Sequence, residues 1–174
     1  ITAMKIILTG YMGSGKSTIA FFLAQKLQIP FKDLDQIIEN ETQMTIKTIF
    51  ESKGEIYFRK LEHTILKQLM ASNESFVLSL GGGTPCYANN HEFLKSEGIV
   101  SFYLKVAIEA LANRLSHEKD VRPILANHDA QGLKDFIAQH LFERSYYYQQ
   151  ATHTIDANDK SAEEIVAEIE SILI

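Results

Sequence analysis

The first group of residues able to do chemistry is a glycine-rich stretch near the N-terminus, in which Gly10, Gly13 and Gly15 precede Lys16 and Ser17. Glycines let the backbone turn its N–H groups inward, and such a loop at the start of a helix cradles phosphate oxygens. The lysine adds positive charge beside the β- and γ-phosphates, and the serine hydroxyl is a ligand for Mg²⁺ held between them. The spacing G-x-x-x-x-G-K-[ST] therefore predicts a site for a nucleoside triphosphate with magnesium.

Kinases, GTPase switches and motor ATPases all use such a phosphate loop, so the rest of the chain must decide between them. The sequence has no Asn-Lys-x-Asp guanine motif and no apolar strand that ends in Asp-Glu, as a mechanical ATPase would require. The stretch from Asp129 to Gly132 matches the D-x-x-G of a GTPase switch, but it lies in a polar region between predicted helices. We interpret that match as a coincidence and favour a small-molecule kinase.

Asp33 and Asp35 follow the short apolar turn at 29–31, and alternation along an extended segment places both carboxylates on one side. As a purely structural feature, the pair would be a solvated loop in which Asp35 caps a helix beginning at Gln36. Beside a phosphate loop, we expect Asp33 to hold the waters of the magnesium ion. Asp35 is then expected to accept the proton of an attacking hydroxyl group, or to orient that group.

Arginine is rare in this chain, which has thirteen lysines and only four arginines, at positions 59, 114, 122 and 144. A planar guanidinium fork matches carboxylate or phosphate oxygens, so a lysine-rich chain is expected to keep arginines for such contacts. The alternative is a surface salt bridge, which contributes little and is most plausible for Arg114. The glycines at 81–83 follow an apolar run, where open α/β sheets bind ligands, although alone they would indicate a plain turn.

Composition excludes several classes of function. The net charge of -5 and the pI near 5.7 leave no basic surface for nucleic acid or for an anionic membrane. Cys86 is the only cysteine, so no intramolecular disulfide or thiolate metal cluster can form, and we expect it to be a small buried hydrophobe. There is no run of about 18 apolar residues, and the first residues show no basic stretch followed by a long apolar region, so we expect neither a membrane span nor a secretion leader. We therefore expect a cytoplasmic protein with small-molecule partners.

The elements that must position these residues follow from hydrophobic periodicity. Apolar runs predict strands, a 3.6-residue period after Lys16 predicts a helix that follows the phosphate loop, and later helices alternate with strands. The predicted strands are 5–9, 76–80, 99–104 and 154–155, and the predicted later helices are 92–96, 107–115, 133–148 and 162–173. This alternation predicts one α/β domain over 1–174, with a parallel doubly wound sheet, a helical insertion and a polar loop near 116–129.

Together the motifs resemble the shikimate kinase family, in the nucleoside-monophosphate-kinase-like branch of P-loop enzymes. The matching segments are 10–18, 33–35, 49–62, 81–83, 122–125 and 143–148. The resemblance implies a three-layer P-loop kinase fold whose five parallel strands have the order 2-3-1-4-5. It also implies a helical substrate-binding insertion at about 35–62 and a mobile lid at about 115–126.

The resemblance further implies the reaction, in which ATP with Mg²⁺ phosphorylates the 3-hydroxyl of shikimate on the route to chorismate and aromatic amino acids. We also expect a monomer. The catalytic residues would be Asp35, Lys16 and Arg122. Shikimate would be bound by Asp35, Arg59, Gly82 and Arg144, and the metal by Ser17 and Asp33. ATP would be bound by Gly13, Ser14, Gly15, Lys16, Ser17, Thr18, Arg114, Arg122 and Lys160, with Asp156 and Ala157 beside the adenine.

The chain departs from the family pattern at three places. Gln43 stands where glycine is frequent, the lid reads Glu-Lys-Asp-Val-Arg over 118–122, and Thr84-Pro85-Cys86 replaces small apolar residues after the triple glycine. Two alternatives remain: a related kinase for another hydroxylated acid, such as gluconate, and a regulator that binds nucleotide without turnover. The Phe58-Arg59-x-x-Glu62 motif with the triple glycine favours shikimate over gluconate. A regulator without turnover would have no need of Asp35 and Arg122.

Overall fold

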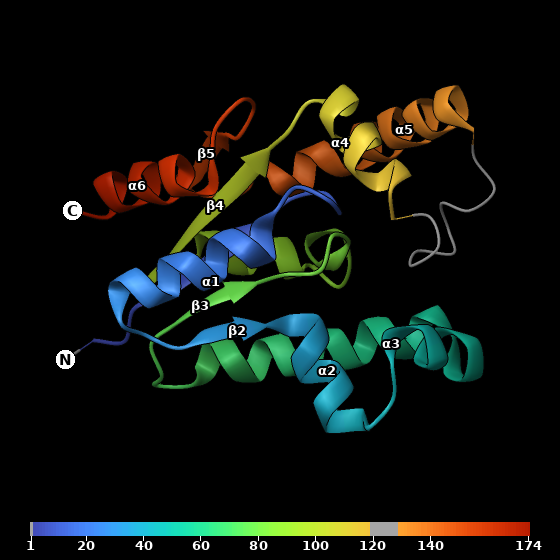
Figure 1. The fold of residues 1–174 in the computed structure, drawn as a ribbon. Coiled ribbons are helices and arrows are strands. Elements are labelled where there is room, and N and C mark those ends of the chain that lie inside the picture. The colour runs from blue at the N-terminus through green and yellow to red at the C-terminus, as the bar shows by residue number, and fades with distance from the viewer. Residues whose placement is uncertain (1, 119–128) are drawn as a thin grey trace.

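The computed structural model describes residues 2–118 and 129–174, in which five parallel strands form one sheet of order β2-β3-β1-β4-β5 (Figure 1). The strands are β1 (Lys5–Thr9), β2 (Phe31–Asp33), β3 (Phe76–Ser79), β4 (Ile99–Lys105) and β5 (His153–Asp156). In the centre of the sheet, Ile7 pairs with Leu78 on one side and with Ser101 on the other. The expected strand order is confirmed.

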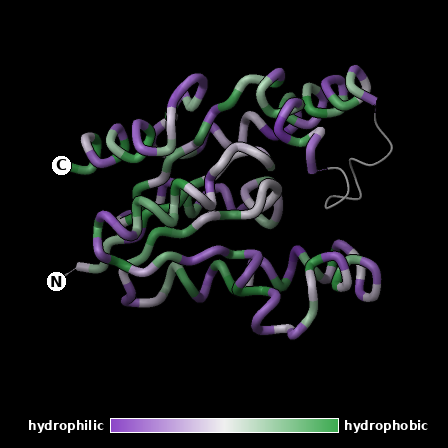
Figure 2. Tube along the Cα trace, viewed as in Figure 1, coloured by the Kyte–Doolittle hydropathy of each residue, from purple (hydrophilic) through white to green (hydrophobic). Residues whose placement is uncertain are grey.

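Helices cover both faces of this sheet. They are α1 (Lys16–Leu27), α2 (Leu34–Thr42), α3 (Ile46–Ala71), α4 (Ile108–Ser116), α5 (Ala130–Tyr148) and α6 (Ala162–Leu173), with the short 3₁₀ helices η1 (Thr84–Cys86) and η2 (Asn90–Lys95). Successive side chains of β1 point to opposite faces. Ile6 and Leu8 pack with α1, α4, α5 and α6, whereas Ile7 packs with α2 and α3. In Figure 2 the hydrophobic colour follows the strands and the inner sides of these helices.

Two local expectations differ from the structure. Asp33, and not Asp35, caps α2, because its Oδ1 accepts a hydrogen bond from the Gln36 amide at 3.1 Å and the helix already begins at Leu34. The helix expected at 92–96 is the 3₁₀ helix η2. The helical insertion contains a break at Gly54, whose φ of 84° is unfavourable for other residues. Beyond the break, α3 continues past residue 62 and covers the sheet with Ile65 and Leu66.

The carboxyl ends of the three neighbouring strands β2, β3 and β1 lead into the segments that carry the predicted site. β1 leads into the phosphate loop, β2 ends at Asp33, and β3 leads into the triple glycine. Parallel strands bring these ends to one edge of the sheet. Most of the expected lid, including Arg122, lies outside the described residues. Within 2–118 and 129–174, no helix has the length and apolar character to cross a membrane.

Candidate active site

The phosphate loop joins β1 to α1 in a conformation that depends on glycine. Gly13 and Gly15 have φ angles of 80° and 91°, in the left-handed region that other residues avoid. Gly15 is the N-cap of α1, so no side chain occupies the first amide groups of the helix. A cavity of about 310 Å³ opens there, lined by Gly13, Gly15, Lys16, Ser17, Thr18, Arg114 and Glu118. Free helix amides beside a lysine make this cavity suitable for phosphate groups.

Two cationic side chains hold this loop. The ammonium group of Lys16 is buried and donates to the Tyr11 carbonyl at 3.3 Å. Arg114, on α4, donates through Nη1 to the Gly13 carbonyl at 3.0 Å. Arg114 therefore contacts the predicted nucleotide site directly, which favours the binding interpretation over the surface salt bridge that its sequence context allowed.

Side-chain oxygens that could hold a metal ion meet at the start of α1. The Ser17 hydroxyl donates to Oδ2 of Asp33 at 2.9 Å and lies 3.1 Å from the hydroxyl of Ser79, at the end of β3. Magnesium prefers hard oxygen ligands and commonly takes one or two from protein, with the others from phosphates and water. Ser17 and Asp33 fit that pattern beside the phosphate loop. Ser79 is a neighbour that the sequence motifs did not single out.

Asp35 lies in the first turn of α2, with its carboxylate facing the triple glycine. A Cβ added to Gly81 would be 3.1 Å from Oδ1 of Asp35. Burial raises the pKa of Asp35 to about 6, with further contributions from the nearby charges of Asp33 and Glu62 and a partial offset from Lys16. A carboxylate with a pKa this close to neutrality is suited to accepting a proton from a hydroxyl group.

The other two glycines face the two predicted acceptor arginines. A Cβ on Gly82 would lie 3.5 Å from Nη1 of Arg144, and a Cβ on Gly83 would lie 2.8 Å from Nη2 of Arg59. Each glycine of the triple therefore leaves room for a different charged group, one carboxylate and two guanidinium groups. The three groups come from α2, α3 and α5, and they converge on a single short backbone segment.

Arg59 is fixed from several sides. Its Nη1 donates to Oε1 of Glu62 at 3.0 Å, and its Nε lies 3.6 Å from Oε1 of Glu55. The Cζ atom is 3.9 Å from the centroid of the Tyr87 ring, a cation–π contact. With a side chain only 16% exposed, Arg59 has lost most of its rotational freedom before any ligand arrives. Such preorganisation favours binding of a carboxylate.

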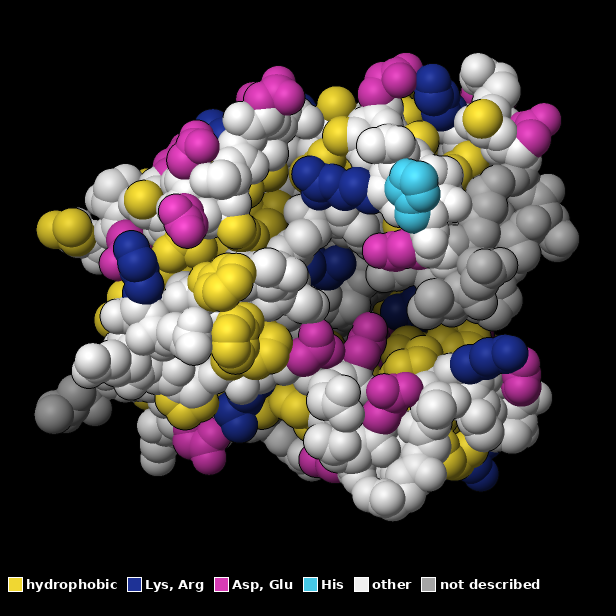
Figure 3. All heavy atoms as spheres, in the orientation of Figure 1, with side chains coloured by type: hydrophobic (Ala, Val, Ile, Leu, Met, Phe, Trp, Pro, Cys, Tyr) yellow, Lys and Arg dark blue, Asp and Glu magenta, His cyan; other side chains and the backbone are white. Residues whose placement is uncertain are grey.

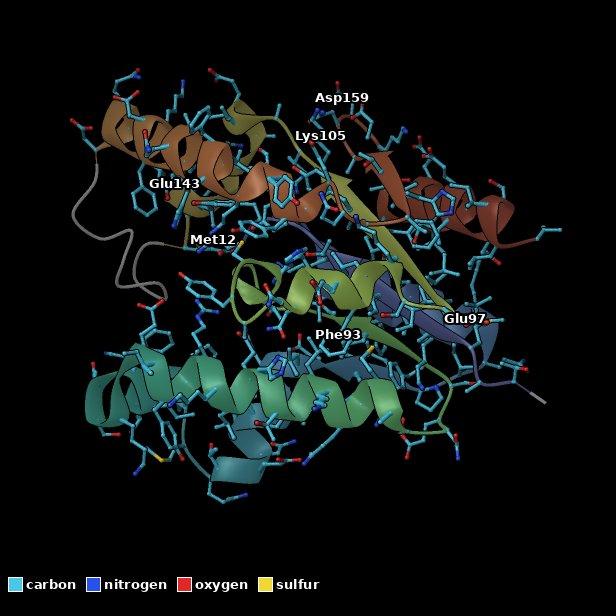
Figure 4. The ribbon with its side chains drawn as sticks, turned by 180° about the vertical axis from the view of Figure 1, so that it is seen from behind. Met12, Phe93, Glu97, Lys105, Glu143 and Asp159 are labelled. Carbon is cyan, nitrogen blue, oxygen red and sulfur yellow. The ribbon has the colours of Figure 1, made fainter. Side chains whose placement is uncertain are left out.

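Arg144 belongs to α5, which contacts both loops of the site. Its Cζ lies 5.8 Å from the centroid of the Tyr11 ring in the phosphate loop. One turn further along α5, the Tyr148 hydroxyl donates to the Gly82 carbonyl. In Figure 4, Met12 of the phosphate loop lies between α5 and the segment that follows the triple glycine. Figure 3 shows a hollow near the middle of the molecule, with basic side chains inside it and acidic side chains along its lower edge.

Some predicted residues stand apart from this centre. Lys160 forms a 2.9 Å ion pair with Glu168 of α6, and Asp156 accepts a hydrogen bond from the Asn158 amide at 3.0 Å. Their expected contacts with the nucleotide stay predictions, as does the role of Arg122. Cys86 is half-buried, and burial raises its thiol pKa to about 11, so it is protonated at neutral pH.

Sequence reasoning did not include Gly81, Gly83, Glu62 or Thr84 in the site. Gly81, Gly83 and Glu62 belong to motifs that the sequence displays, but the sequence does not indicate which charged group each glycine faces. Thr84 carried a weak signal, because it is a polar residue where the family pattern has a small apolar one. Its Oγ1 donates to Oε2 of Glu62 at 2.8 Å.

Comparison with known proteins gives concordant matches over nearly the whole chain. A profile described as shikimate kinase matches residues 12–173. The shikimate kinase of Flavobacterium johnsoniae is 53% identical over 169 residues, which is 97% of this chain and 98% of that protein. The shikimate kinase of Flavobacterium psychrophilum is 48% identical, with the same coverage of each.

Solved structures agree with these sequence matches. The crystal structure of shikimate kinase from Bacteroides thetaiotaomicron has a TM-score of 0.89 and 36% identity, and the match covers 98% of each chain. The structure of shikimate kinase from Acinetobacter baumannii in complex with shikimate has a TM-score of 0.87 and 34% identity, covering 99% of this chain and 93% of that one.

Proposed function

The chain belongs to the shikimate kinase family, and on that premise we propose that it transfers the γ-phosphoryl group of ATP to the 3-hydroxyl of shikimate. The products are shikimate 3-phosphate and ADP. One observation carries the proposal: the three glycines at 81–83 each leave room for a different charged group, namely Asp35, Arg144 and Arg59. This arrangement fits an acceptor that has hydroxyl groups on one side and a carboxylate on the other.

In this proposal the acceptor is held by charge and by shape. The guanidinium groups of Arg59 and Arg144 bind the carboxylate, for which their planar forks provide paired donors. Asp35 accepts hydrogen bonds from the hydroxyl groups, and Gly82 allows the ring to approach the backbone. The absence of a side chain matters most at Gly81 and Gly83, because a Cβ there would come within 3.1 Å of Asp35 and 2.8 Å of Arg59.

The phosphates occupy the other end of the site. Residues 13–18 provide inward backbone amides and the start of α1, while Lys16 places its charge beside the β- and γ-phosphates. Ser17 and Asp33 would hold Mg²⁺, directly or through its waters, and the bound ion would supply positive charge to the phosphate oxygens. Arg114 supports the loop and flanks the nucleotide. Arg122 and Lys160 complete the nucleotide contacts.

Asp35 handles the proton of the reaction. A new bond forms between the 3-hydroxyl oxygen and the γ-phosphorus, the bond to the β–γ bridging oxygen breaks, and ADP leaves with that electron pair. The hydroxyl proton passes to Asp35. With a pKa of about 6, the carboxylate is mostly ionised at neutral pH, in a ratio of about ten to one, yet is more basic than an exposed aspartate.

We further propose that the protein acts as a monomer in the cytoplasm, with ATP and shikimate as its partners. The product would supply the route to chorismate and aromatic amino acids. The arrangement of Asp35 with two arginines favours this acceptor over gluconate, because gluconate has no ring to lie against the glycine segment.

The test is the rate of ADP release with ATP and Mg²⁺, measured in parallel with shikimate, with gluconate and without acceptor. We expect strong stimulation by shikimate alone. Stimulation by gluconate alone would identify gluconate as the acceptor, as in the related kinase. If neither acid stimulates ADP release, the assignment of shikimate as acceptor is rejected, whereas the assignment of the nucleotide site stands. A phosphorus NMR spectrum of the product then distinguishes a sugar-acid phosphate ester from free phosphate.

A further inference from the structure

Glu62 is a buried carboxylate whose two oxygens have different partners. It lies on α3, three residues after Arg59, and is 1% exposed. Its Oε1 accepts from Nη1 of Arg59 at 3.0 Å, and its Oε2 accepts from Oγ1 of Thr84 at 2.8 Å. A carboxylate can accept hydrogen bonds from both terminal nitrogens of a guanidinium group at once. Here one of the two oxygens accepts its hydrogen bond from the Thr84 hydroxyl instead.

The position of Thr84 is itself fixed by a chain of hydrogen bonds. Thr84 is fully buried, and its carbonyl accepts from Nδ2 of Asn90 at 3.0 Å. Because Asn90 donates through its amide nitrogen, its Oδ1 is the acceptor for Nδ1 of His63 at 2.6 Å. His63 is next to Glu62 on α3, so the chain of contacts runs from α3 through η1 and η2 and returns to α3. This closed path holds the hydroxyl against the carboxylate.

Loss of the Thr84 hydroxyl would leave Oε2 of Glu62 buried without that donor. A buried carboxylate oxygen needs a hydrogen-bond donor, and Arg59 is the other side chain that already donates to this carboxylate, through Nη1. The carboxylate would then bind Arg59 through two nitrogens and draw Nη2 away from the triple glycine. Nη2 is the nearer of the two terminal nitrogens to a Cβ added at Gly83, at 2.8 Å against 3.1 Å for Nη1, on the side where the acceptor would lie.

We propose that Thr84 is a positioning residue for acceptor binding, because its hydroxyl occupies Oε2 of Glu62 and so keeps Nη2 of Arg59 available for the acceptor carboxylate. The inference rests on the proposed function, which assigns that carboxylate to Arg59. It also gives a physical role to the departure at Thr84, since a small apolar residue there would offer no donor to Glu62.

The test replaces Thr84 by valine, which has nearly the same shape and no hydroxyl. We expect Thr84→Val to raise the KM for shikimate about tenfold and to leave the KM for ATP within about twofold. Thr84→Ser restores the donor and returns the shikimate KM to within about twofold of the parent. With the methyl ester of shikimate, which lacks the carboxylate charge, the valine variant and the parent should have the same KM.

The matched control is Thr9→Val. Thr9 is also fully buried, and among the described residues its Oγ1 has no hydrogen-bond partner, so the same atomic change there should alter neither KM. If Thr84→Val does not fold, Thr84→Ala and Thr84→Ser form a second pair that differs only in the hydroxyl oxygen. An unchanged shikimate KM in the variant without hydroxyl, or an equal rise in both KM values, would overturn the positioning role.

A second measurement separates this inference from the proposed function. The chain has only four arginines, so their Nε–H signals can be assigned by NMR. We expect the Arg59 signal of Thr84→Val to shift relative to the parent, while the Arg114 signal of the same variant does not. In Thr9→Val the arginine signals should have the same positions as in the parent. An unmoved Arg59 signal rejects the positioning role. If the parent is not stimulated by shikimate, the proposed function fails, and the NMR result still decides how Thr84 acts on Arg59.

Discussion

The replacement Asp35→Asn should make the ligand-free protein more stable while removing most of its activity. In the folded protein the Asp35 pKa is raised from 3.8 to about 6, chiefly because burial disfavours the charged form. An acid with a raised folded-state pKa binds more protons folded than unfolded, so stability falls as pH rises from about 4 to about 6. Above pH 6 the buried carboxylate is ionised and lowers the free energy of unfolding by the full amount. Asparagine has no charge, so the replacement removes this loss of stability.

The size of the effect follows from the shift. A difference of about two pKa units corresponds to about 3 kcal/mol of unfolding free energy at neutral pH. We therefore expect Asp35→Asn to gain about 2 to 3 kcal/mol at pH 7, or about 5 to 10 °C in Tm for a chain of this length. At pH 4 the gain should nearly vanish, because the parent carboxyl group is then mostly protonated in both states.

The assay is thermal unfolding of both proteins without ligands from pH 4 to pH 8, together with phosphoryl transfer at pH 7. Asp135→Asn is the matched control, since Asp135 is exposed on α5 and the same change there should leave Tm nearly constant. We expect kcat to fall by about 10² to 10⁴ in Asp35→Asn. A Tm gain independent of pH would refute the burial argument, and activity within twofold of the parent would refute the proton-accepting role.

Four further outcomes test the site. In the parent, kcat/KM for shikimate should fall about tenfold per pH unit below pH 6, as protonation removes the Asp35 carboxylate, and a flat profile to pH 5 would contradict this. Arg59→Lys should raise the KM for shikimate at least tenfold despite keeping the charge, because the fork is lost; steady-state kinetics with both substrates check this. Gly83→Ala should displace Nη2 of Arg59, which a Cβ there would approach to 2.8 Å, and so weaken shikimate binding measured by calorimetry. Ser17→Ala should raise the Mg²⁺ concentration needed for half-maximal activity, which a magnesium titration measures.

The phosphate loop could be predicted from the sequence because all its functional groups lie within nine consecutive residues. Strand order followed from the family resemblance and is confirmed. The three-residue strand β2 escaped the periodicity analysis, because three residues are too few for alternation to be seen. The capping role of Asp33 was also missed, since Asp33 and Asp35 are equally good caps in sequence and only the backbone at Gln36 distinguishes them.

The sequence indicated which residues form the acceptor site, but not which of them lie against one another. Arg59 and Arg144 are separated by 85 positions, and the sequence does not indicate that Gly83 faces one and Gly82 the other. The pairing of Glu62 with Thr84 bridges 22 positions and depends on how α3 packs beside η1. Such contacts arise from tertiary packing, which local patterns do not encode.

Asp33 has a consequence for how the two substrates influence each other. One of its oxygens fixes the start of α2, the helix that carries Asp35, and the other meets Ser17 at the start of α1. A metal ion bound to Oδ2 of Asp33 would pull this carboxylate toward the nucleotide. Because Oδ1 of the same carboxylate caps α2, the pull would also shift the helix that carries Asp35. Coupling of this kind is reciprocal, so the factor by which nucleotide tightens the acceptor is also the factor by which the acceptor tightens the nucleotide. We therefore expect a single carboxylate, that of Asp33, to couple the two binding events.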